Sequence, residues 1–585
     1  MKNRNPIWGY CRSSVLAVMA TALVAACSHD SSTSPKPTNG TACKASSGSG
    51  VVTLGPLQTA TLDCSQGGTV FDLAGNGASY LLVPEFATGN VPITATSFTI
   101  GSPNATAASA ALQAAEMPDR VTNAQRALDA ALRGRDRTLL RSRTLGVRAQ
   151  RSVSPGGAGK NVTTPDVGTF RSFRVISSIS SSTNPAFKTV DARLAYVGTN
   201  LLLYVDTLTA ANGFATGDLS GIGDLFDKTL YPIDIAAFGQ PSDIDNNARL
   251  IMLMTPVVNA LVTSAECDEN GFVAGFFTGF DLAGTTTDSN QGEVFYTIAP
   301  DPNGVSSCAH TVASIERTVP ATFLHEMQHL INFSQHVIVH GGRAAEEGWL
   351  DEGLSIVAEE LGSRYYEKKF PPPTGRTNPL QLFPDSSQGF IAELLGDSYT
   401  YLLRPDTVAV TLHSDSDDGT AWRGSVWLLA RWLGDQKGED LYKRLEATTL
   451  TGTANIESAT GESFTKLFGD FGIAMYADSI TGVARTSVPQ RDRFLTRNLR
   501  QLYAALFRAA GPSTDVPRAF PIVVRTIPAN QSVAASMVPG TVSYFRVDTP
   551  AGGATVRLGF ASSTGNALPS SLRPQVAILR LPPGV

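Results

Sequence analysis

The sequence predicts an α+β protein whose central region has a β-rich part and a helical part and lies between small all-β modules. Short β-prone runs broken by glycine and proline occur near both ends, in residues 51–104 and 520–585. The first half of the central region has longer β-prone runs, such as residues 249–254, and its second half has apolar residues at helical spacing, such as residues 424–433. Glycine (53) and proline (34) are plentiful, which favours turn-rich β structure outside the helical part.

Length and charge limit the architecture and the partners. A chain of 585 residues is too long for one compact core and predicts several domains. Charged residues make up 17% of the chain and the formal net charge is -5, so there is no basic surplus of the kind that binds nucleic acid. We therefore expect no nucleic-acid partner.

The first residues have the pattern of an export signal. Basic residues precede an apolar segment that is too short to span a bilayer and that ends in Leu-Val-Ala-Ala-Cys27, which resembles the lipobox of bacterial lipoproteins. We predict a lipoprotein signal peptide in residues 1–26, a lipid on Cys27, and a flexible Ser/Thr/Pro-rich tether in residues 27–50. A plain secretory signal cut near Ala26 is the alternative.

Either signal places the mature chain outside the cytoplasm, as a lipoprotein of the bacterial cell envelope (outer membrane or cell surface) or as a secreted protein. An even number of cysteines remains after Cys11 and Cys27, and disulfides are expected in an exported chain. Four cysteines allow three connectivities. We favour the local pairs Cys43–Cys64 and Cys267–Cys308.

The two terminal β segments share a rhythm of strands and breaks. Residues 51–104 contain Gly68-Thr-Val and end near Ala-Thr-Gly-Asn90, and residues 520–585 contain Gly540-Thr-Val followed by Ser-Thr-Gly-Asn566. The sequence therefore predicts a small β domain and a C-terminal β-sandwich-like module that are copies of one unit. We expect them to space and stabilise the chain rather than to bind glycans or substrate.

Residues 105–165 have a different composition, rich in alanine, leucine and arginine. The composition predicts a basic helix followed by a glycine-rich connector. We favour a solvated linker helix, because basic exposed linkers are common and nothing specifies a processing site. A propeptide upstream of the central region is the alternative.

Residues 166–512 contain the candidate site. His325, Glu326 and His329 form a His-Glu-x-x-His pattern within a largely apolar segment, and Pro320 fits the first turn of a helix. Residues four apart share one face of a helix, so both imidazoles can bind one zinc ion. Glu326, beside them, can take a proton from a water on that ion.

A second helix is predicted in residues 344–361. Glu352 lies 23 positions after His329 and can return a carboxylate to the metal, which completes two histidines, one glutamate and a water. Glu359, seven positions further on, is a candidate to hold one histidine by a hydrogen bond, and a solvent-facing carboxylate is the alternative.

Together, Phe-Leu-His-Glu-Met-Gln-His-Leu-Ile-Asn-Phe (residues 323–333) and Glu-Gly-Trp-Leu-Asp-Glu-Gly-Leu-Ser (residues 347–355) resemble the hyicolysin family of bacterial zinc metallopeptidases, within the gluzincins. The resemblance covers approximately residues 195–480. It implies a zincin-like catalytic domain with a β-rich upper lobe and a helical lower lobe. It also implies that the two histidines and Glu352 hold one zinc ion per chain and that Glu326 is the catalytic base.

Gluzincins also use a tyrosine or histidine to stabilise the oxyanion that forms during hydrolysis. We single out His413 for this role. The alternatives are Tyr365, Tyr366, Tyr399 and Tyr401. Rival metal ligands that stand outside the register of the histidine pair, or close to Glu352 in sequence, are His310, His336, His340, Glu346 and Glu347.

Two acidic stretches superficially resemble calcium loops, namely residues 243–247 and the group Asp415, Asp417 and Asp418. The first stretch lacks the glycine and the closing glutamate of an EF-hand. Calcium is therefore possible but not predicted, and we favour turns with capping side chains.

These features predict a zinc metalloendopeptidase that hydrolyses proteins or peptides outside the cytoplasm through a zinc-activated water and a glutamate base. The expected partners are these substrates and, through the lipid anchor, a membrane. The alternative is a non-catalytic surface lipoprotein that binds a partner through its β modules. Intact Glu326 argues against it, because a structural metal site needs no base.

Overall fold

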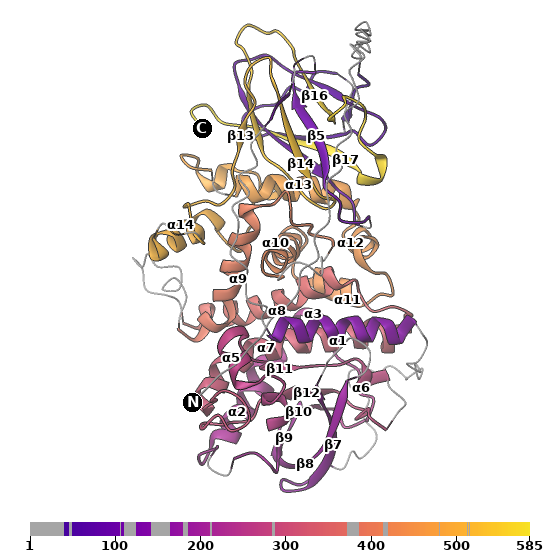
Figure 1. Cartoon of the computed structure of the whole chain (residues 1–585), viewed down its shortest axis with the longest axis vertical. Helices are drawn as coiled ribbons and strands as arrows, with labels where there is room; N and C mark the ends of the chain where they lie inside the picture. The colour runs from indigo at the N-terminus through magenta and orange to yellow at the C-terminus, as the bar shows by residue number, and fades with distance from the viewer. Residues whose placement is uncertain are drawn as a thin grey trace, which may run out of the picture. The chain divides into compact units, whose positions relative to one another are not determined.

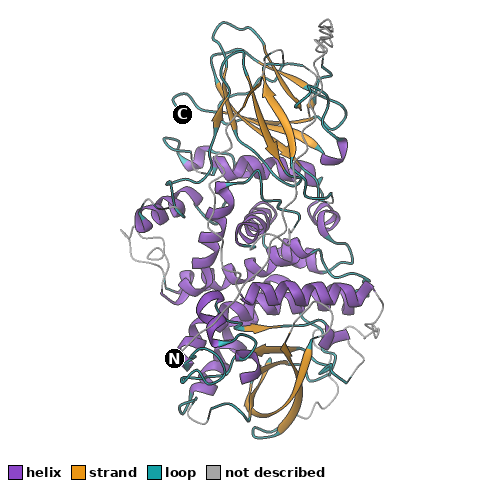
Figure 2. Cartoon of the chain, viewed as in Figure 1, coloured by secondary structure: helices purple, strands orange, loops and turns teal. Residues whose placement is uncertain are grey.

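A computed structural model describes most of the chain after residue 39 (Figure 1). Residues Asn39–Val585 form one compact unit of helices and sheets, so the fold is α+β (Figure 2). The predicted signal peptide, Cys27 and most of the tether lie outside the described residues. The described residues are 40–45, 50–89, 91–103, 105, 107–109, 124–141, 164–178, 185–210, 213–283, 287–370, 385–412, 419–478, 480–511, 513 and 515–585.

The central region contains a six-stranded sheet with the strand order β11-β12-β10-β9-β8-β7. Strands β9, β10 and β12 are parallel, whereas β11, β8 and β7 run antiparallel to their neighbours. Strand β10 is a Leu-Ile-Met-Leu-Met run that is buried along its whole length, as in a strand covered on both faces. Strand β11 forms one edge of the sheet. The strands are β7 (Phe170–Ser178), β8 (Ala186–Val197), β9 (Leu201–Asp206), β10 (Leu250–Met254), β11 (Gly275–Phe276) and β12 (Val294–Thr297).

Further helices lie along this half of the chain. They are α2 (Asp218–Leu225), a π-helix (Phe226–Leu230), α3 (Tyr231–Phe238), α4 (Pro256–Asn259), α5 (Ser264–Asn270) and α6 (Phe280–Ala283). Helix α5 begins with a capping box in which Thr263 and Glu266 bond to each other's backbone, so its start is set locally.

Helix α7 (Val312–Phe333) packs against α8 (Gly348–Lys369) and also contacts β11 and β12. The Thr311 hydroxyl accepts a hydrogen bond from the Ser314 N–H at 3.2 Å and caps the start of α7. Pro320 consequently lies inside the helix and not in its first turn, where the sequence pattern placed it. The cap lies upstream of the apolar run, and that is why the apolar pattern alone misplaced the start.

The second half of the central region is helical, as predicted. Helix α10 packs against α8 and α9, which also contact each other, and most side chains of α10 are buried. Trp427 and Trp432 are in the core, so the aromatic stripe is structural, as the spacing indicated. A π-helix, Ser334–Val339, extends α7. The remaining helices are α9 (Asp385–Leu403), α10 (Thr420–Lys437), α11 (Asp440–Glu446), α12 (Gly452–Thr460), α13 (Phe464–Ala477) and α14 (Leu499–Ala510).

The two terminal β segments build one sandwich together. Its sheets have the strand orders β1-β2-β17-β4-β15-β13 and β3-β16-β5-β14-β6, so both sheets mix strands from the two ends of the chain. The expectation of two separate copies is therefore wrong. Strand β17 fills the place between β2 and β4 that no strand of the N-terminal segment takes. The strands are β1 (Lys44–Ala45), β2 (Thr59–Asp63), β3 (Val70–Leu73), β4 (Ser79–Phe86), β5 (Thr96–Gly101), β6 (Ala107–Ser109), β13 (Arg525–Thr526), β14 (Ser532–Met537), β15 (Phe545–Asp548), β16 (Val556–Ser562) and β17 (Pro574–Arg580).

Two disulfides join the cysteine pairs that the sequence favours. Cys43 and Cys64 are bonded within the sandwich. Cys267 of α5 is bonded to Cys308, which lies in the loop before α7. The second bond ties the segment after β10 to the start of the candidate site helix, and loop closure of this kind restricts the unfolded chain.

Helix α1 (Ala124–Arg141) occupies part of the segment that was expected to be a solvated linker. The helix is present, but one of its faces is buried, and the expectation of an exposed linker is wrong for this part. The arginine-rich composition suggested solvent, yet two of these arginines have acidic partners: Arg126 lies 3.0 Å from Asp397, and Arg133 lies 3.9 Å from Glu326. The buried residues of α1 are Leu128, Asp129, Leu132, Arg133, Arg135, Asp136 and Leu140.

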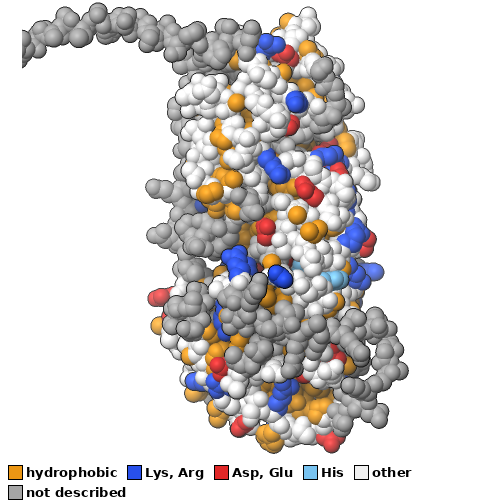
Figure 3. Space-filling model, turned by 90° about the vertical axis from the view of Figure 1, so that its right-hand side faces the viewer, with side chains coloured by type: hydrophobic (Ala, Val, Ile, Leu, Met, Phe, Trp, Pro, Cys, Tyr) orange, Lys and Arg blue, Asp and Glu red, His pale blue; other side chains and the backbone are white. Residues whose placement is uncertain are grey.

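The molecular surface carries both signs of charge. Figure 3 shows basic and acidic side chains scattered among each other on one face, in keeping with the composition. Among the described helices, none has the length and apolar character to cross a membrane.

A buried carboxyl group in the sandwich generates a prediction about stability. Glu85 on β4 is fully buried, and burial raises its pKa to about 8 from an ordinary value of 4.5. Between these pH values the folded state keeps a proton that the unfolded state releases, so Glu85 lowers stability as the pH rises from about 4.5 to 8.

Glu85→Gln should therefore raise the free energy of unfolding at pH 8 by about 1–3 kcal/mol, and the gain should shrink toward pH 5. Urea unfolding at both pH values measures it. Glu269→Gln, at an exposed position on α5, is the control and should change little. An equal destabilisation by Glu85→Gln at both pH values would contradict the prediction.

Candidate metal centre

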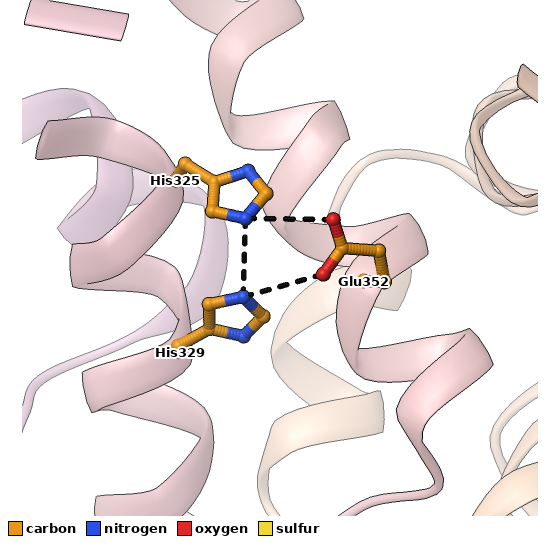
Figure 4. A group of neighbouring side chains, drawn as sticks. All are labelled: His325, His329 and Glu352. Carbon is orange, nitrogen blue, oxygen red and sulfur yellow. Dashed lines mark hydrogen bonds and ion pairs between the residues drawn. The ribbon is translucent and has the colours of Figure 1, made fainter. Parts of the chain in front are cut away.

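Two histidines of α7 and one glutamate of α8 converge inside the protein (Figure 4). The Nε2 atoms of His325 and His329 face each other at 3.2 Å, and the carboxylate oxygens of Glu352 lie 3.6 and 3.5 Å from these nitrogens. All three side chains are buried. The histidines are one helical turn apart, so the helix sets their spacing, and the packing of α7 on α8 supplies the carboxylate. This group could hold a metal ion.

The other ring nitrogen of each histidine is bonded to a carboxylate. Nδ1 of His325 lies 2.7 Å from Glu359 Oε1, and Nδ1 of His329 lies 2.9 Å from Asp351 Oδ1. When these two carboxylates are ionised they accept, so each Nδ1 donates its proton and each Nε2 offers a lone pair to a metal ion. The two Nε2 atoms lie 3.2 Å apart, and the Ser355 hydroxyl lies 3.3 Å from Nε2 of His325. The donor set therefore fits a metal ion.

The pKa values around the histidines are shifted in both directions, and burial, with the Glu393 carboxylate nearby, raises that of Glu359 well above its usual range. Burial, with the neighbouring His329, lowers the pKa of His325 well below its usual range, so this imidazole is neutral, the form that binds metals. Burial alone would raise the pKa of Asp351. The adjacent His329, helped by Arg133 and Arg137, outweighs burial and lowers that pKa, so Asp351 stays anionic.

Glu326 points from α7 toward the edge of the sheet. Its side chain is fully buried, and Oε2 accepts a hydrogen bond at 2.9 Å from the backbone N–H of Phe277, which directly follows β11. The Arg133 guanidinium lies 3.9 Å from the same oxygen. Oε1 accepts no hydrogen bond from an N–H group, and the Asp129 carboxyl group forms a hydrogen bond with the Glu326 side chain. One oxygen of Glu326 is thus held by the backbone after β11, whereas the other has no backbone donor.

Arg423 of α10 lies behind the ligand carboxylate. Its guanidinium contacts Glu352 and lies 3.3 Å from Glu359, so it holds both acidic side chains from one side. Burial, with Arg126 nearby, lowers its pKa to about 9. The close approach of α10 favours a small residue after Glu352, because a Cβ at Gly353 would lie only 3.0 Å from the Val426 carbonyl oxygen.

Helix α1 brings a further carboxylate to the site. Ligand atoms of Asp129, His325 and Glu326 lie within 4.8 Å of one another, and this second group could also hold a metal ion. Burial and the neighbouring Glu326 carboxylate raise the pKa of Asp129 well above its usual range. Nothing in the sequence pattern pointed to Asp129, because its segment is separated from the motif by the whole sheet.

Sequence reasoning located part of the surroundings of the histidines. Glu359 bonds to His325, which is the contact that was considered for it. Asp351 was missed, although it directly precedes Glu352 on the same helix, and a carboxylate beside a ligand is a usable signal. Arg423 was also missed, since only packing of α10 on α8 brings it close.

The rival ligands have other partners. Glu346 accepts hydrogen bonds from Gly452 and Asn455, and Glu347 accepts one from the Trp349 indole. The groups of described residues that could hold a metal contain neither of them, nor any of the histidines at positions 310, 336 and 340.

The structure describes the four tyrosines considered for the oxyanion role, but not His413. His413 lies outside the described residues, as do Asp415, Asp417 and Asp418. Tyr399 donates to the Arg518 carbonyl at 2.6 Å. The other tyrosines make contacts elsewhere: Tyr365 lies under Lys369, Tyr366 stacks on Phe390, and Tyr401 is buried near Glu85 and Asp406.

A third acidic group lies in the loop that resembled a calcium site. Ligand atoms of Asp243, Asp245 and Glu293 lie within 4.8 Å of one another. Asp243 accepts from the Ala248 N–H at 3.1 Å, and Asp245 accepts from the backbone and the side chain of Asn247. These are the capping turns that the sequence suggested.

The geometry can be compared with known proteins. No protein-family model matches the chain. Neutral metalloprotease ShpI of Staphylococcus hyicus is 26% identical to it over 193 residues, which is 32% of this chain. The chain is similar to a metalloprotease. The match spans 40% of the length of that relative. The group of two histidines and a glutamate that could hold a metal ion agrees with this similarity.

The carboxylates behind the histidines generate the next prediction. Asp351→Asn replaces the anionic acceptor of His329 by a neutral amide and should weaken metal binding by about 10- to 100-fold. Competition with a chromophoric chelator measures the affinity. Asp440→Asn, an exposed carboxylate on α11, is the matched control and should bind metal like the wild type. Equal affinities of both variants and the wild type would refute the role assigned to Asp351.

Proposed function

We propose that the protein is a zinc-dependent metallopeptidase that cleaves peptide bonds in proteins or peptides outside the cytoplasm. The observation that carries the proposal is the buried group of His325, His329 and Glu352, whose two Nε2 lone pairs face each other. Two imidazoles and one carboxylate are the ligand set of many catalytic zinc sites, which keep one position open for water. The similarity to a neutral metalloprotease supports the same activity.

The residues of the site would divide the work as follows. When bound, zinc supplies a Lewis acid that polarises the scissile carbonyl and makes water more acidic. His325, His329 and Glu352 hold the ion, and Asp351 and Glu359 keep the imidazoles in the binding tautomer.

Glu326 would move the proton. Its Oε1, which has no N–H donor, takes a proton from the attacking water as the oxygen adds to the carbonyl carbon. The same proton then passes from Glu326 to the amine nitrogen as the C–N bond breaks, which restores the carboxylate. The bond from the Phe277 N–H to Oε2 keeps this side chain oriented between the sheet edge and the metal ligands.

Strand β11 is the edge to which we assign the substrate. An extended peptide can add to a free strand edge through backbone hydrogen bonds. The sheet has two edge strands, β11 and β7. We choose β11 because Phe277, the residue directly after it, donates its N–H to Glu326. An added strand there would bring its peptide bond to the base. The zincin-like arrangement of sheet and helices is part of this proposal.

The activity is tested by separating metal binding from turnover. Wild type should contain one zinc ion per chain, and chelation should abolish hydrolysis of a fluorogenic peptide library, assayed before and after limited proteolysis of the chain. Glu326→Gln should keep the zinc and lose about 10²- to 10⁴-fold in turnover in both states. His329→Ala should lose both. A wild-type chain that binds no zinc would sink the proposal and favour the non-catalytic alternative.

We also propose the cell-envelope location, with a lipid on Cys27 and a secreted protein as the alternative. The proposal rests on the apolar segment that ends in Leu-Val-Ala-Ala-Cys27. Cys27→Ser should move the protein from the membrane fraction to the soluble fraction and abolish incorporation of labelled fatty acid in a bacterial host. Cys11→Ser is the control. A wild-type protein found only in the soluble fraction, without label, would support the secreted alternative.

A further inference from the structure

Helix α1 covers the edge of β11 that faces away from β12. The side-chain amide of Gln125 donates to the Gly275 carbonyl at 2.7 Å and accepts from the N–H groups of Ala274 (2.8 Å) and Gly275 (3.4 Å). A donor and an acceptor on one side chain thus make the pair of contacts that a neighbouring strand would make. The edge residue Gly275 is therefore not open to a further strand.

Contacts of the same kind continue along the chain past β11. The Arg133 guanidinium donates to the Phe277 carbonyl and lies 5.3 Å from the centre of the Phe277 ring. Asp136 accepts from the Gly279 N–H at 2.7 Å and from the Thr278 hydroxyl at 3.3 Å. One face of α1 therefore follows this segment and uses side chains to satisfy its backbone groups.

The middle of the same face carries the carboxylate that reaches the metal ligands. Asp129 is buried, and its oxygen belongs to a group with His325 and Glu326 whose ligand atoms lie within 4.8 Å of one another. A water attacking a bound peptide has to lie between Glu326 and the metal ligands. The carboxyl group of Asp129, next to both, takes up that space and is a ligand of the type that zinc accepts.

We propose that α1 is an intramolecular inhibitor of the metal centre. The Asp129 carboxylate ligates the bound metal in place of the attacking water, while Gln125 occupies the strand edge assigned to the substrate and Arg133 and Asp136 cover the segment that follows it. The inference rests on the proposed peptidase function, whose regulation it describes. It concerns the described helix alone; the segments on either side, residues 110–123 and 142–163, are outside the described residues.

The contacts indicate how inhibition would end. Leu128, Leu132 and Leu140 are buried against the rest of the protein, so α1 has apolar contacts to lose and does not leave readily while it is joined to the chain at both ends. The strands before it would stay, because β4 and β5 are paired with β15, β17, β14 and β16 from the C-terminal end. Release of α1 by cleavage therefore leaves the sandwich intact.

A first experiment tests the ligand. The metal-free full chain is loaded with Co²⁺, and its visible absorption spectrum is recorded for wild type and Asp129→Asn. Loss of an oxygen ligand should change the spectrum. Ala130→Asn places the same amide at the next, exposed position of α1 and should leave it unchanged. Identical spectra for all three folded proteins, as judged by circular dichroism, would overturn the assignment of Asp129.

A second experiment tests the inhibition. Recognition sequences for a sequence-specific viral protease are placed in residues 110–123 and 142–163 of the zinc-loaded full chain, and the cut chain is separated from the α1 peptide. Binding of a short peptide hydroxamate, measured by calorimetry, should strengthen by at least about tenfold after cutting, and hydrolysis of a fluorogenic peptide should rise in parallel. A synthetic peptide of residues 124–141 should restore inhibition, and the same peptide with Asp129→Asn should be weaker.

The outcomes separate the two claims. Equal probe binding and equal hydrolysis before and after cutting would overturn the inhibitor and leave the peptidase standing, with α1 as a fixed wall of the site. A cut, zinc-loaded chain that neither binds the hydroxamate nor hydrolyses any peptide would contradict the peptidase itself. Cut Glu326→Gln that binds the probe but is inactive supports both.

Discussion

Two imidazole lone pairs facing each other inside the protein are the constraint on which the rest of the structure depends. The backbone of α7 sets the spacing of His325 and His329, and the carboxylates of α8 hold both rings in the tautomer that exposes Nε2. Two imidazoles and a carboxylate buried together in this way form a group that could hold a cation. Helix α8 packs in turn on α10, and a Cβ at Gly353 would lie in tight contact, 3.0 Å, with the Val426 carbonyl oxygen.

The charges around the histidines form a buried network drawn from distant parts of the chain. Arg133 of α1 faces Glu326, and Arg423 of α10 holds Glu352 and Glu359. Each of these ions would be costly to bury alone, and breaking one partner leaves the other uncompensated. The network therefore couples the position of α1 to that of the metal ligands, although α1 is far from them in sequence.

The helices and the group of two histidines and one glutamate could be predicted from the sequence because both depend on short-range spacing. The His-Glu-x-x-His pattern lies within one helix, and Glu352 lies on the next, so helical periodicity and one interval suffice. Asp129 and Arg423 could not be found in this way, since their role arises from packing between elements well apart in the chain. The arginine-rich composition of α1 suggested a solvated helix, but the fold supplies acidic partners such as Asp397 for Arg126. The similar spacing of strands and breaks at the two ends suggested two modules, but strands of both ends pair in one sandwich.

The sandwich has a consequence for the order in which the protein can fold. Strand β17, which follows all the other described strands, lies in the interior of its sheet between β2 and β4. Strands β2 and β4 therefore keep unpaired edges until residues 574–580 have been made, and such long-range pairing is slow. The N-terminal strands are thus the part of the molecule most dependent on chaperones or on rapid completion of synthesis.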